Sequence, residues 1–263
     1  MQECRLTRLI NCNEEALDLL VRATPFLHGH ERYVVLSIAD ISHEKRRCAL
    51  ERIFFHDIIN LGGGADGLLE QLLTQAPVEL RDDLELSHEA VHELVEEVET
   101  QRDLAAAERG ELAVEPSLLN SAQILSQMAR IYSAHPLAKD KLIRMAPSAA
   151  ALDFTTAATL LNRVLGNLIK NAVEACAPGE TVTLGCEKMG NKLRFSVHNP
   201  ATMPREVQLQ IFKRSFTTKG AGRGLGTYSV KLLTERHLKG QVHFVSLPAQ
   251  GTTAPVPHSP SLL

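Results

Sequence analysis

A helical repeat of apolar residues over residues 42–75 is the feature that most constrains this chain. The apolar residues recur every three or four positions, which places them on one stripe of a helix: Leu50, Phe54, Ile58, Leu61, Ala65, Leu68 and Leu72. Pro77 ends this run, and a second helical run with strongly acidic faces follows over residues 83–108. Two long amphipathic helices joined by a short turn form a helical hairpin. One hairpin buries little by itself, so we expect two copies to pair as a four-helix bundle.

The second half of the chain alternates between helical and strand patterns. We expect helices at 118–132, 156–175 and 225–237, a connector at 136–147, and strands at 181–187, 192–197 and 241–247. Near the N-terminus, residues 33–38 also have the composition of a strand. The whole pattern predicts the α+β class, in which the hairpin is followed by an α/β sandwich with helices on one face of a mixed sheet.

Composition and charge exclude several classes of protein. The 263 residues include 44% hydrophobic residues and carry a formal net charge of -3, which argues against a disordered chain and against a nucleic-acid binder. We find neither a signal peptide nor an apolar run long enough for a membrane span. The five cysteines have no CxxC spacing, which is typical of reduced, cytoplasmic protein.

His56 is the residue of the first helix with the clearest chemical potential. It lies two residues from both Phe54 and Ile58, so it points away from the apolar stripe and toward solvent. Asp57 follows it, and Asn60 lies one helical turn further on. An exposed imidazole beside a carboxylate can act as a nucleophile; the alternative is a solvated surface histidine.

Two other motifs in the hairpin allow competing interpretations. Gly62, Gly63 and Gly64 predict either a bend just past His56 or a break of the helix. Residues 88–92 read HEAVH, which matches the HExxH pattern of zinc metalloproteases, in which Glu89 would act as base. No third ligand follows this motif, so we favour a structural role for it in the hairpin.

The C-terminal half contains a more specific set of motifs. Asn167 and Asn171 lie four residues apart on one helix face, where their amides can bind a hard cation or a phosphate. Phe212 and Phe216 precede Lys219, and the sequence GRGLG over residues 222–226 then opens a helix. Glycines and free backbone N–H groups at a helix start allow close approach by phosphates.

Taken together, these motifs resemble those of sensor histidine kinases. The sequence NLIKNAVEA resembles the N box of their GHKL-type ATP-binding domain, SFTTKGAGRGLGT resembles the F and G2 boxes, and Gly251-Thr252-Thr253 resembles the final glycine-threonine box. FHDIIN over residues 55–60 resembles the H box of the dimerisation domain, and residues 33–41 resemble the end of a PAS sensor domain. The implied segments are a PAS-like remnant at 1–41, the hairpin at 42–115, a Bergerat-type catalytic domain at 116–253 and a tail at 254–263.

The resemblance implies a role for each matching residue. His56 would be the phosphoacceptor, Asp57 the general base, and Asn60 the residue that orients water in the reverse phosphatase reaction. Asn171 would hold Mg²⁺ against the triphosphate of ATP. The other nucleotide-binding residues implied are Asn167, Lys170, Asn199, Phe212, Phe216, Lys219, Gly222, Arg223, Gly224, Leu225, Gly226 and Thr252. The related ATP hydrolases have a general-base glutamate at the position of Asn167, which favours phosphoryl transfer to a side chain over hydrolysis.

Two positions depart from the family pattern. The family's G1 box has an aspartate that accepts a hydrogen bond from the adenine amino group, whereas this chain has Asn199. Pro255, Pro257 and Pro260 follow the glycine-threonine box where the family continues a strand, so we expect the last strand to be missing or frayed.

The sequence therefore predicts a cytoplasmic, homodimeric histidine kinase that uses Mg-ATP to phosphorylate His56. The phosphoryl group would then pass to an aspartate of a response regulator receiver domain. The alternative is a dimeric scaffold that docks a response regulator without binding ATP.

Overall fold

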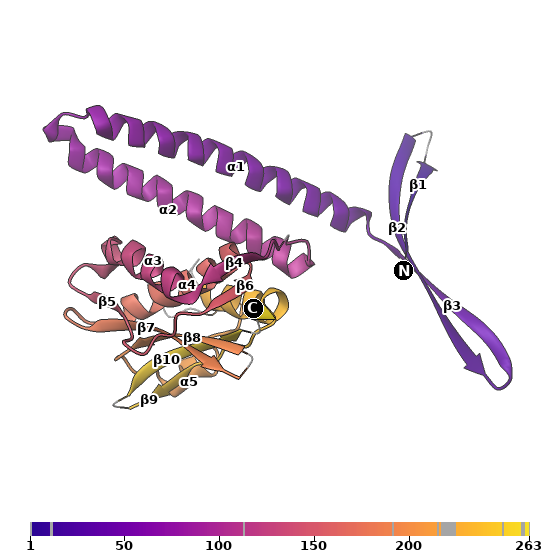
Figure 1. The fold of residues 1–263 in the computed structure, drawn as a ribbon. Helices are drawn as coiled ribbons and strands as arrows, with labels where there is room; N and C mark the ends of the chain where they lie inside the picture. The colour runs from indigo at the N-terminus through magenta and orange to yellow at the C-terminus, as the bar shows by residue number, and fades with distance from the viewer. Residues whose placement is uncertain are drawn as a thin grey trace. The chain divides into compact units, whose positions relative to one another are not determined.

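The computed structural model describes residues 2–10, 13–112, 114–190, 192–214, 216, 225–248, 250–258 and 261–262. The chain divides into two compact units, Met1–Asp103 and Leu104–Leu263 (Figure 1). The four functional segments expected from the sequence, with boundaries after residues 41, 115 and 253, do not coincide with these two units and remain predictions.

The first unit begins with a three-stranded antiparallel sheet. Its strands β1 (Gln2–Ile10), β2 (Asn13–His28) and β3 (Glu31–Asp40) lie in the order β1-β2-β3. The strand expected at residues 33–38 lies within β3 and is confirmed. Every residue of β3 is exposed, although the strand is rich in apolar side chains.

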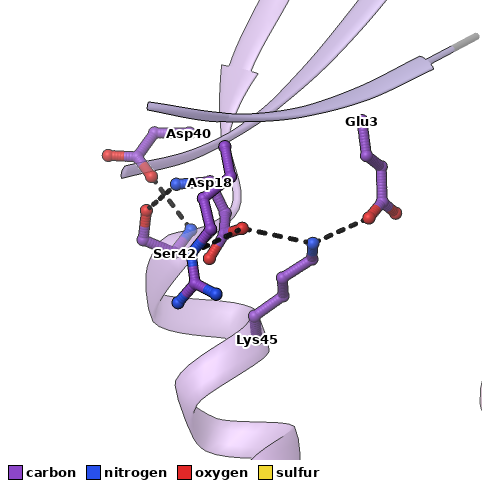
Figure 2. A network of polar contacts seen from close by, with 6 residues as sticks. Glu3, Asp18, Asp40, Ser42 and Lys45 are labelled. Carbon is purple, nitrogen blue, oxygen red and sulfur yellow. Dashed lines mark hydrogen bonds and ion pairs between the residues drawn. The ribbon is translucent and has the colours of Figure 1, made fainter. Parts of the chain in front are cut away.

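A polar network joins this sheet to the start of the first helix (Figure 2). The Lys45 ammonium lies 2.7 Å from a Glu3 carboxylate oxygen and 3.3 Å from Asp18 Oδ1. The buried Ser42 hydroxyl accepts from the Asp18 N–H at 2.8 Å, and the Ser42 N–H donates to Asp40 Oδ1 at 2.9 Å. The contacts with Glu3 and Asp18 raise the pKa of Lys45. These contacts hold the first turn of α1 against the strands of the sheet.

The hairpin consists of α1 (Ser42–Gln75) and α2 (Val78–Arg109). The expected bounds of the first helix are confirmed, whereas α2 begins five residues before position 83, directly after Pro77. Helix α1 continues unbroken through Gly62, Gly63 and Gly64, so the expectation of a helix break is wrong. The two helices approach closely here, because a Cβ on Gly62 would lie 2.6 Å from Val95 Cγ2.

The apolar stripe of α1 does not all face α2. Five members of the stripe are more than half exposed: Leu50, Phe54, Leu61, Leu68 and Leu72. The residues shown to face α2 include Gly62 and Asp66, which lie on a different line along the helix. Most of the apolar stripe is therefore not covered by α2.

The second unit is built on a five-stranded sheet in the order β5-β7-β8-β10-β9. Its strands are β5 (Leu142–Met145), β7 (Thr181–Met189), β8 (Lys192–Asn199), β9 (Val245–Leu247) and β10 (Gly251–His258). β5 and β7 are parallel, and the other neighbours are antiparallel. Helices α3 (Ser121–Ser133) and α4 (Ala158–Ala175) pack on this sheet, with α4 over β7 and β8 (Figure 1). The expected strand hairpin is confirmed as β7 and β8.

A second small sheet and four short helices complete this unit. The sheet has the order β11-β6-β4, with β4 (Ser117–Asn120), β6 (Asp153–Thr156) and β11 (Ser261–Leu262). The short helices are η1 (Pro136–Ala138), α5 (Arg205–Gln208), α6 (Gly226–Leu232) and the π-helical η2 (Leu233–His237). Together they confirm the α+β sandwich expected after the hairpin.

Several expected element bounds in this unit were wrong. Residues 118–120 belong to β4 and not to a helix. Helix α3 begins only after Asn120, because the Asn120 side chain caps its N-terminus by accepting from the N–H groups of Ala122 and Gln123. The expected connector at 136–147 contains η1 and β5. The strand expected at 241–247 is limited to β9.

The expectation that prolines would remove the last strand was also wrong. β10 pairs with β8 from Thr252 to His258, with Pro255 opposite Ser196 and Pro257 opposite Arg194. The two prolines have the same parity, so their nitrogens face the same side of the strand. On the side of β9, the described pairing ends at Thr253, which leaves that edge open. Proline is tolerated where no ladder hydrogen bond is required of it.

Among the described residues, no helix combines the length and the apolar character that crossing a membrane requires.

Candidate functional site

His56 lies on α1 with its imidazole in solvent. Its side chain is 71% exposed and that of Asp57 is 63% exposed, which agrees with the orientation expected from helical spacing. His56 Nδ1 lies 3.1 Å from Asp57 Oδ1, and Asn60 Nδ2 lies 3.2 Å from His56 Nε2. A carboxylate at Nδ1 favours the tautomer with the proton on Nδ1, which leaves the lone pair on Nε2. The structure thus brings together the three residues expected to act in catalysis.

The HExxH motif of α2 points into the hairpin. His92 Nδ1 lies 3.1 Å from Asp66 Oδ2, and His88 Nε2 lies 3.3 Å from Asp66 Oδ1. Asp66 Oδ1 makes no hydrogen bond within the described part of the chain, so its contact with His88 does not have hydrogen-bond geometry. No three His, Cys, Asp or Glu side chains are arranged to hold a metal ion among the residues that the structure describes. The two histidines of the motif thus contact a carboxylate of α1, which fits the structural role expected for them in the hairpin.

Helix α4 positions the pair of asparagines in the second unit. Its apolar face is buried over the sheet through residues such as Leu161, Leu165 and Leu168. Asn171 Nδ2 donates to the carbonyl oxygen of Asn167 at 2.8 Å, which assigns the amide nitrogen to the helix backbone and makes Oδ1 the atom suited to a cation. Asn167 Nδ2 is buried and has no hydrogen-bond partner among the described residues.

Asn199 lies at the end of β8 on the face that α4 covers. Alternate residues of β8 are buried, so Asn199 shares this face with Val197 and Phe195. Thr252 of β10 lies directly opposite Asn199. Asn199 is 5% exposed and Thr252 is 6% exposed, and Asn199 Nδ2 has no hydrogen-bond partner in the described structure. Asn199 and Thr252 thus form a buried polar pair at the end of the apolar face of β8 and β10.

A chain of hydrogen bonds fixes the segment that follows Asn199. The Met203 N–H donates to Ser246 Oγ at 2.7 Å, and Ser246 Oγ lies 2.8 Å from Thr252 Oγ1. Thr252 Oγ1 in turn donates to the Ala201 carbonyl at 2.7 Å. The hydroxyl of Thr252 therefore donates its proton to the Ala201 carbonyl oxygen and not to Asn199. No motif in the sequence pointed to Ser246, whose hydroxyl contacts a residue 43 positions away.

Some of the remaining expected site residues lie in the described part of the chain and others lie outside it. Phe212 packs on Phe244 with ring centroids 5.2 Å apart, and Lys231 Nζ lies 5.5 Å from the Phe212 ring centroid. Gly226 begins α6, where a Cβ would lie 3.7 Å from Asn167 Oδ1, so this helix start adjoins the asparagine. Leu225, Phe216 and Lys170 are half-buried. Lys219, Gly222, Arg223 and Gly224 lie outside the described residues.

Glu108, which the sequence did not single out, connects the end of α2 to the rest of the second unit. Its Oε1 accepts from the Tyr228 hydroxyl at 3.0 Å and lies 3.3 Å from Arg214 Nη1. Leu104 and Ala107 on the same helix are buried in the core of this unit. The last turns of α2 are therefore part of the second unit.

Comparison with known proteins defines the class of the second unit. Residues 156–260 match the family model described as the histidine kinase-, DNA gyrase B- and HSP90-like ATPase. The fold of the catalytic domain of the histidine kinase ThkA is similar, with a TM-score of 0.50 at 23% identity, covering 55% of this chain and 95% of that one. This part of the chain is similar in sequence to the ATPase domains of that family, and it has the fold of the ThkA domain.

Similarity over a longer range identifies the kind of protein. The chain is 28% identical over 221 residues to the sensor histidine kinase CusS of Escherichia coli O157:H7, covering 81% of this chain and 43% of CusS. The structure of full-length ShkA in complex with AMPPNP matches with a TM-score of 0.63 at 23% identity, covering 83% of this chain and 46% of ShkA. The chain is thus similar to sensor histidine kinases over most of its length, and it spans less than half the length of CusS.

Proposed function

We propose that this protein is an ATP-dependent histidine kinase that phosphorylates His56 and passes the phosphoryl group to an aspartate of a response regulator receiver domain. The observation that carries the proposal is the pairing of two sites in one chain. His56 is exposed beside Asp57, and the second unit holds two buried asparagine amide nitrogens without hydrogen-bond partners among the described residues.

The residues present fit a bound nucleotide. Buried polar groups normally form hydrogen bonds, and the Nδ2 atoms of Asn167 and Asn199 have no such partner in the part of the chain that the structure describes, so we expect them to donate to a ligand. Asn171 presents its Oδ1 as a ligand for Mg²⁺, which would neutralise charge on the phosphates when bound. Lys170 and Gly226 flank Asn171 and Asn167 and support a site for phosphates here.

His56 would act through Nε2. Its lone pair forms a bond to the γ-phosphorus as the bond from that phosphorus to the β,γ-bridging oxygen breaks, and ADP departs with the electron pair. The ring then gains positive charge, and Asp57, 3.1 Å from Nδ1, stabilises or accepts the Nδ1 proton. Asn60 must turn away from Nε2 for this step, and in the reverse reaction its amide would orient water.

We further propose that the working form is a cytoplasmic homodimer. Pairing two hairpins would cover the exposed stripe of α1 that includes Phe54 and Leu61. The sheet of β1, β2 and β3 would be the end of a PAS-like sensor segment, and its junction at Ser42 and Lys45 would connect the sensor to α1.

Labelling with radioactive ATP tests this function. The wild-type protein should incorporate phosphate that is stable to base and labile to acid, as expected of a phosphohistidine. His56→Gln should remove this label, while His43→Gln, on the same helix, should label normally. Labelling of His56→Gln at the wild-type level would contradict the assignment of His56.

The alternative from a different class is a scaffold that docks a regulator without ATP. The replacement of the usual aspartate by Asn199 is the observation that favours it. Calorimetric titration with Mg-ATP separates the two proposals, because a scaffold would give no binding heat.

A further inference from the structure

The strand β3 forms an open edge of the N-terminal sheet. In the order β1-β2-β3 it pairs with β2 alone, in continuous register from Glu31 to Asp40. On the other side of β2, the pairing with β1 reaches only to Val21, so residues 22–28 and 31–37 extend as a ribbon of two strands (Figure 1). A two-stranded ribbon is at best marginally stable in water, and a further strand on the open edge of β3 would stabilise it.

This edge does not have the features that usually prevent an edge strand from pairing with another chain. Between Tyr33 and Ala39 the sequence of β3 has no charged residue, proline or glycine. The opposite edge strand, β1, carries the exposed charged residues Glu3 and Arg5 within its length. A long apolar edge without such charges is a site of association. The exposed large apolar residues of β3 are Tyr33, Val34, Val35, Leu36 and Ile38.

The turn between β2 and β3 determines which backbone groups of β3 face outward. Gly29, with a φ of +63°, and His30 form a two-residue turn between the two strands. Such a turn closes on a hydrogen-bonded pair, here His28 and Glu31, and bonded pairs alternate with non-bonded pairs along the ladder. We therefore assign the odd-numbered residues of β3 to the bonds with β2. The even-numbered residues direct their N–H and C=O groups outward, where a second strand can pair with them.

The even-numbered residues of β3 are complementary to themselves in one antiparallel register. Pairing of two copies around a two-fold axis at Leu36 places Arg32 of each copy opposite Asp40 of the other. The same register places Val34 opposite Ile38. A slip of two residues in either direction removes both ion pairs and sets a charge opposite an apolar residue. Because opposite charges across a strand pair are favourable, the charges at the two ends of β3 select this register.

We infer that β3 pairs edge to edge with β3 of a second copy of this chain, in the antiparallel register centred on Leu36. The two ribbons then join into one sheet in the order β2-β3-β3-β2. Asp40 already accepts from the Ser42 N–H, and a carboxylate has further acceptor sites for the guanidinium of Arg32. The inference goes beyond the proposed function, because it requires neither ATP nor His56. It adds a contact between copies to the one proposed along α1.

Disulfide cross-linking of the full chain tests this register. The background has serine in place of Cys4, Cys12 and Cys48. In the inferred register Leu36 lies opposite Leu36 of the second copy, with about 5.5 Å between the α-carbons, which is within the range of a disulfide. Leu36→Cys should therefore form a covalent dimer on oxidation with diamide. Thermal unfolding under reducing conditions would verify that each variant is folded.

Val34→Cys and Ile38→Cys are matched controls on the same edge. Each residue lies four residues, or about 13 Å along the strand, from the same residue of the second copy, which is too far for a disulfide. Each variant alone should therefore cross-link at least about tenfold more slowly than Leu36→Cys. An equimolar mixture of the two should cross-link rapidly, because Val34 lies opposite Ile38. Pairing of copies along α1 alone does not produce this pattern.

Reversal of one charge is the second test. Arg32→Glu would place two carboxylates opposite each other at both ends of the paired strands, so it should slow the cross-linking of Leu36→Cys by about tenfold. Arg32→Lys keeps the positive charge and should cross-link at nearly the rate of Leu36→Cys alone.

Two results would overturn the inference. If folded Leu36→Cys cross-links no faster than Val34→Cys, then β3 does not pair with itself in this register, and another strand or the face of another sheet covers it. If Arg32→Glu leaves the rate unchanged, the ion pairs with Asp40 do not select the register. Labelling of His56 is a separate measurement, so neither result changes the proposed function.

Discussion

Gly62 of α1 and Val95 of α2 approach so closely that a β-carbon on residue 62 would lie 2.6 Å from Val95 Cγ2. Valine is stiff about χ1, so its methyl group cannot easily turn aside. The neighbouring Gly63 has open space where a Cβ would be. One glycine of the triplet is thus required by packing, and the next is not.

This contrast predicts opposite effects for two identical substitutions. Gly63→Ala should stabilise α1 by about 1 kcal/mol, because alanine has a higher helix propensity than glycine. Gly62→Ala should be less stable than Gly63→Ala by about 1–3 kcal/mol, because it overpacks the hairpin. Thermal unfolding at one protein concentration measures both. Adding Val95→Ala to Gly62→Ala should recover part of the loss, and equal stability of the two alanine variants would refute the argument.

A second prediction concerns the contacts of Glu108. The hydrogen bond from Tyr228 is partly buried, and both burial and this bond raise the pKa of Tyr228. The Arg214 side chain is 62% exposed, so its ion pair with Glu108 is screened by water. Tyr228→Phe should therefore cost about 1–2 kcal/mol and Arg214→Ala less than about 0.5 kcal/mol.

Denaturant unfolding of the two variants checks this order. Glu108→Gln is the matched control, because it removes the charge and keeps an acceptor for the tyrosine hydroxyl. If Arg214→Ala proves as costly as Tyr228→Phe, the ion pair and not the hydrogen bond holds the end of α2.

Thiol reactivity gives a third prediction. Burial raises the pKa of the Cys186 thiol to about 11, and the side chain is 3% exposed. Since only the thiolate reacts, ionisation alone should slow alkylation of Cys186 at pH 8 by about two orders of magnitude relative to an ordinary cysteine of pKa about 8.5. Cys4 is exposed and should react first. Peptide mapping after a short treatment with iodoacetamide at pH 8 distinguishes them.

The same shift has a consequence for stability, and its sign can be worked out. The folded state holds the proton of Cys186 more tightly than the unfolded state, because its pKa is raised. This contribution to the free energy of unfolding is complete below about pH 8.5 and is lost as the pH rises toward 11. Cys186→Ser should show a weaker loss of stability over that range, and an unchanged pH profile would contradict the origin of the shift.

Local patterns in the sequence predicted the elements that local physics controls. The spacing of apolar residues and the position of Pro77 gave both ends of α1, and the turn at residue 190 gave the hairpin of β7 and β8. The four-residue strands β4, β5 and β6 were missed, since short apolar stretches such as Leu118 and Leu119 fit a helix or a strand equally well.

Other features depend on contacts that no local pattern records. The prolines of β10 are tolerated because of where β9 ends, and neither strand alone reveals this. The exposure of His56, by contrast, followed from the local geometry of its helix. The polar chain through Ser246 joins residues far apart in sequence, and so only the folded structure brings it to light.

That polar chain yields a last prediction. Ser246 Oγ accepts from the Met203 N–H at 2.7 Å and lies 2.8 Å from Thr252 Oγ1. Ser246→Ala leaves the Met203 N–H without its acceptor and breaks the link to Thr252, which should cost about 1–3 kcal/mol. Ser246→Thr keeps a hydroxyl on a strand that suits threonine, and it should retain most of the stability. Because the chain fixes the segment that follows Asn199, Ser246→Ala should also weaken nucleotide binding. Thermal unfolding and titration with Mg-ATP measure the two effects, and equal stability of the alanine and threonine variants would show that the hydroxyl does not hold this segment.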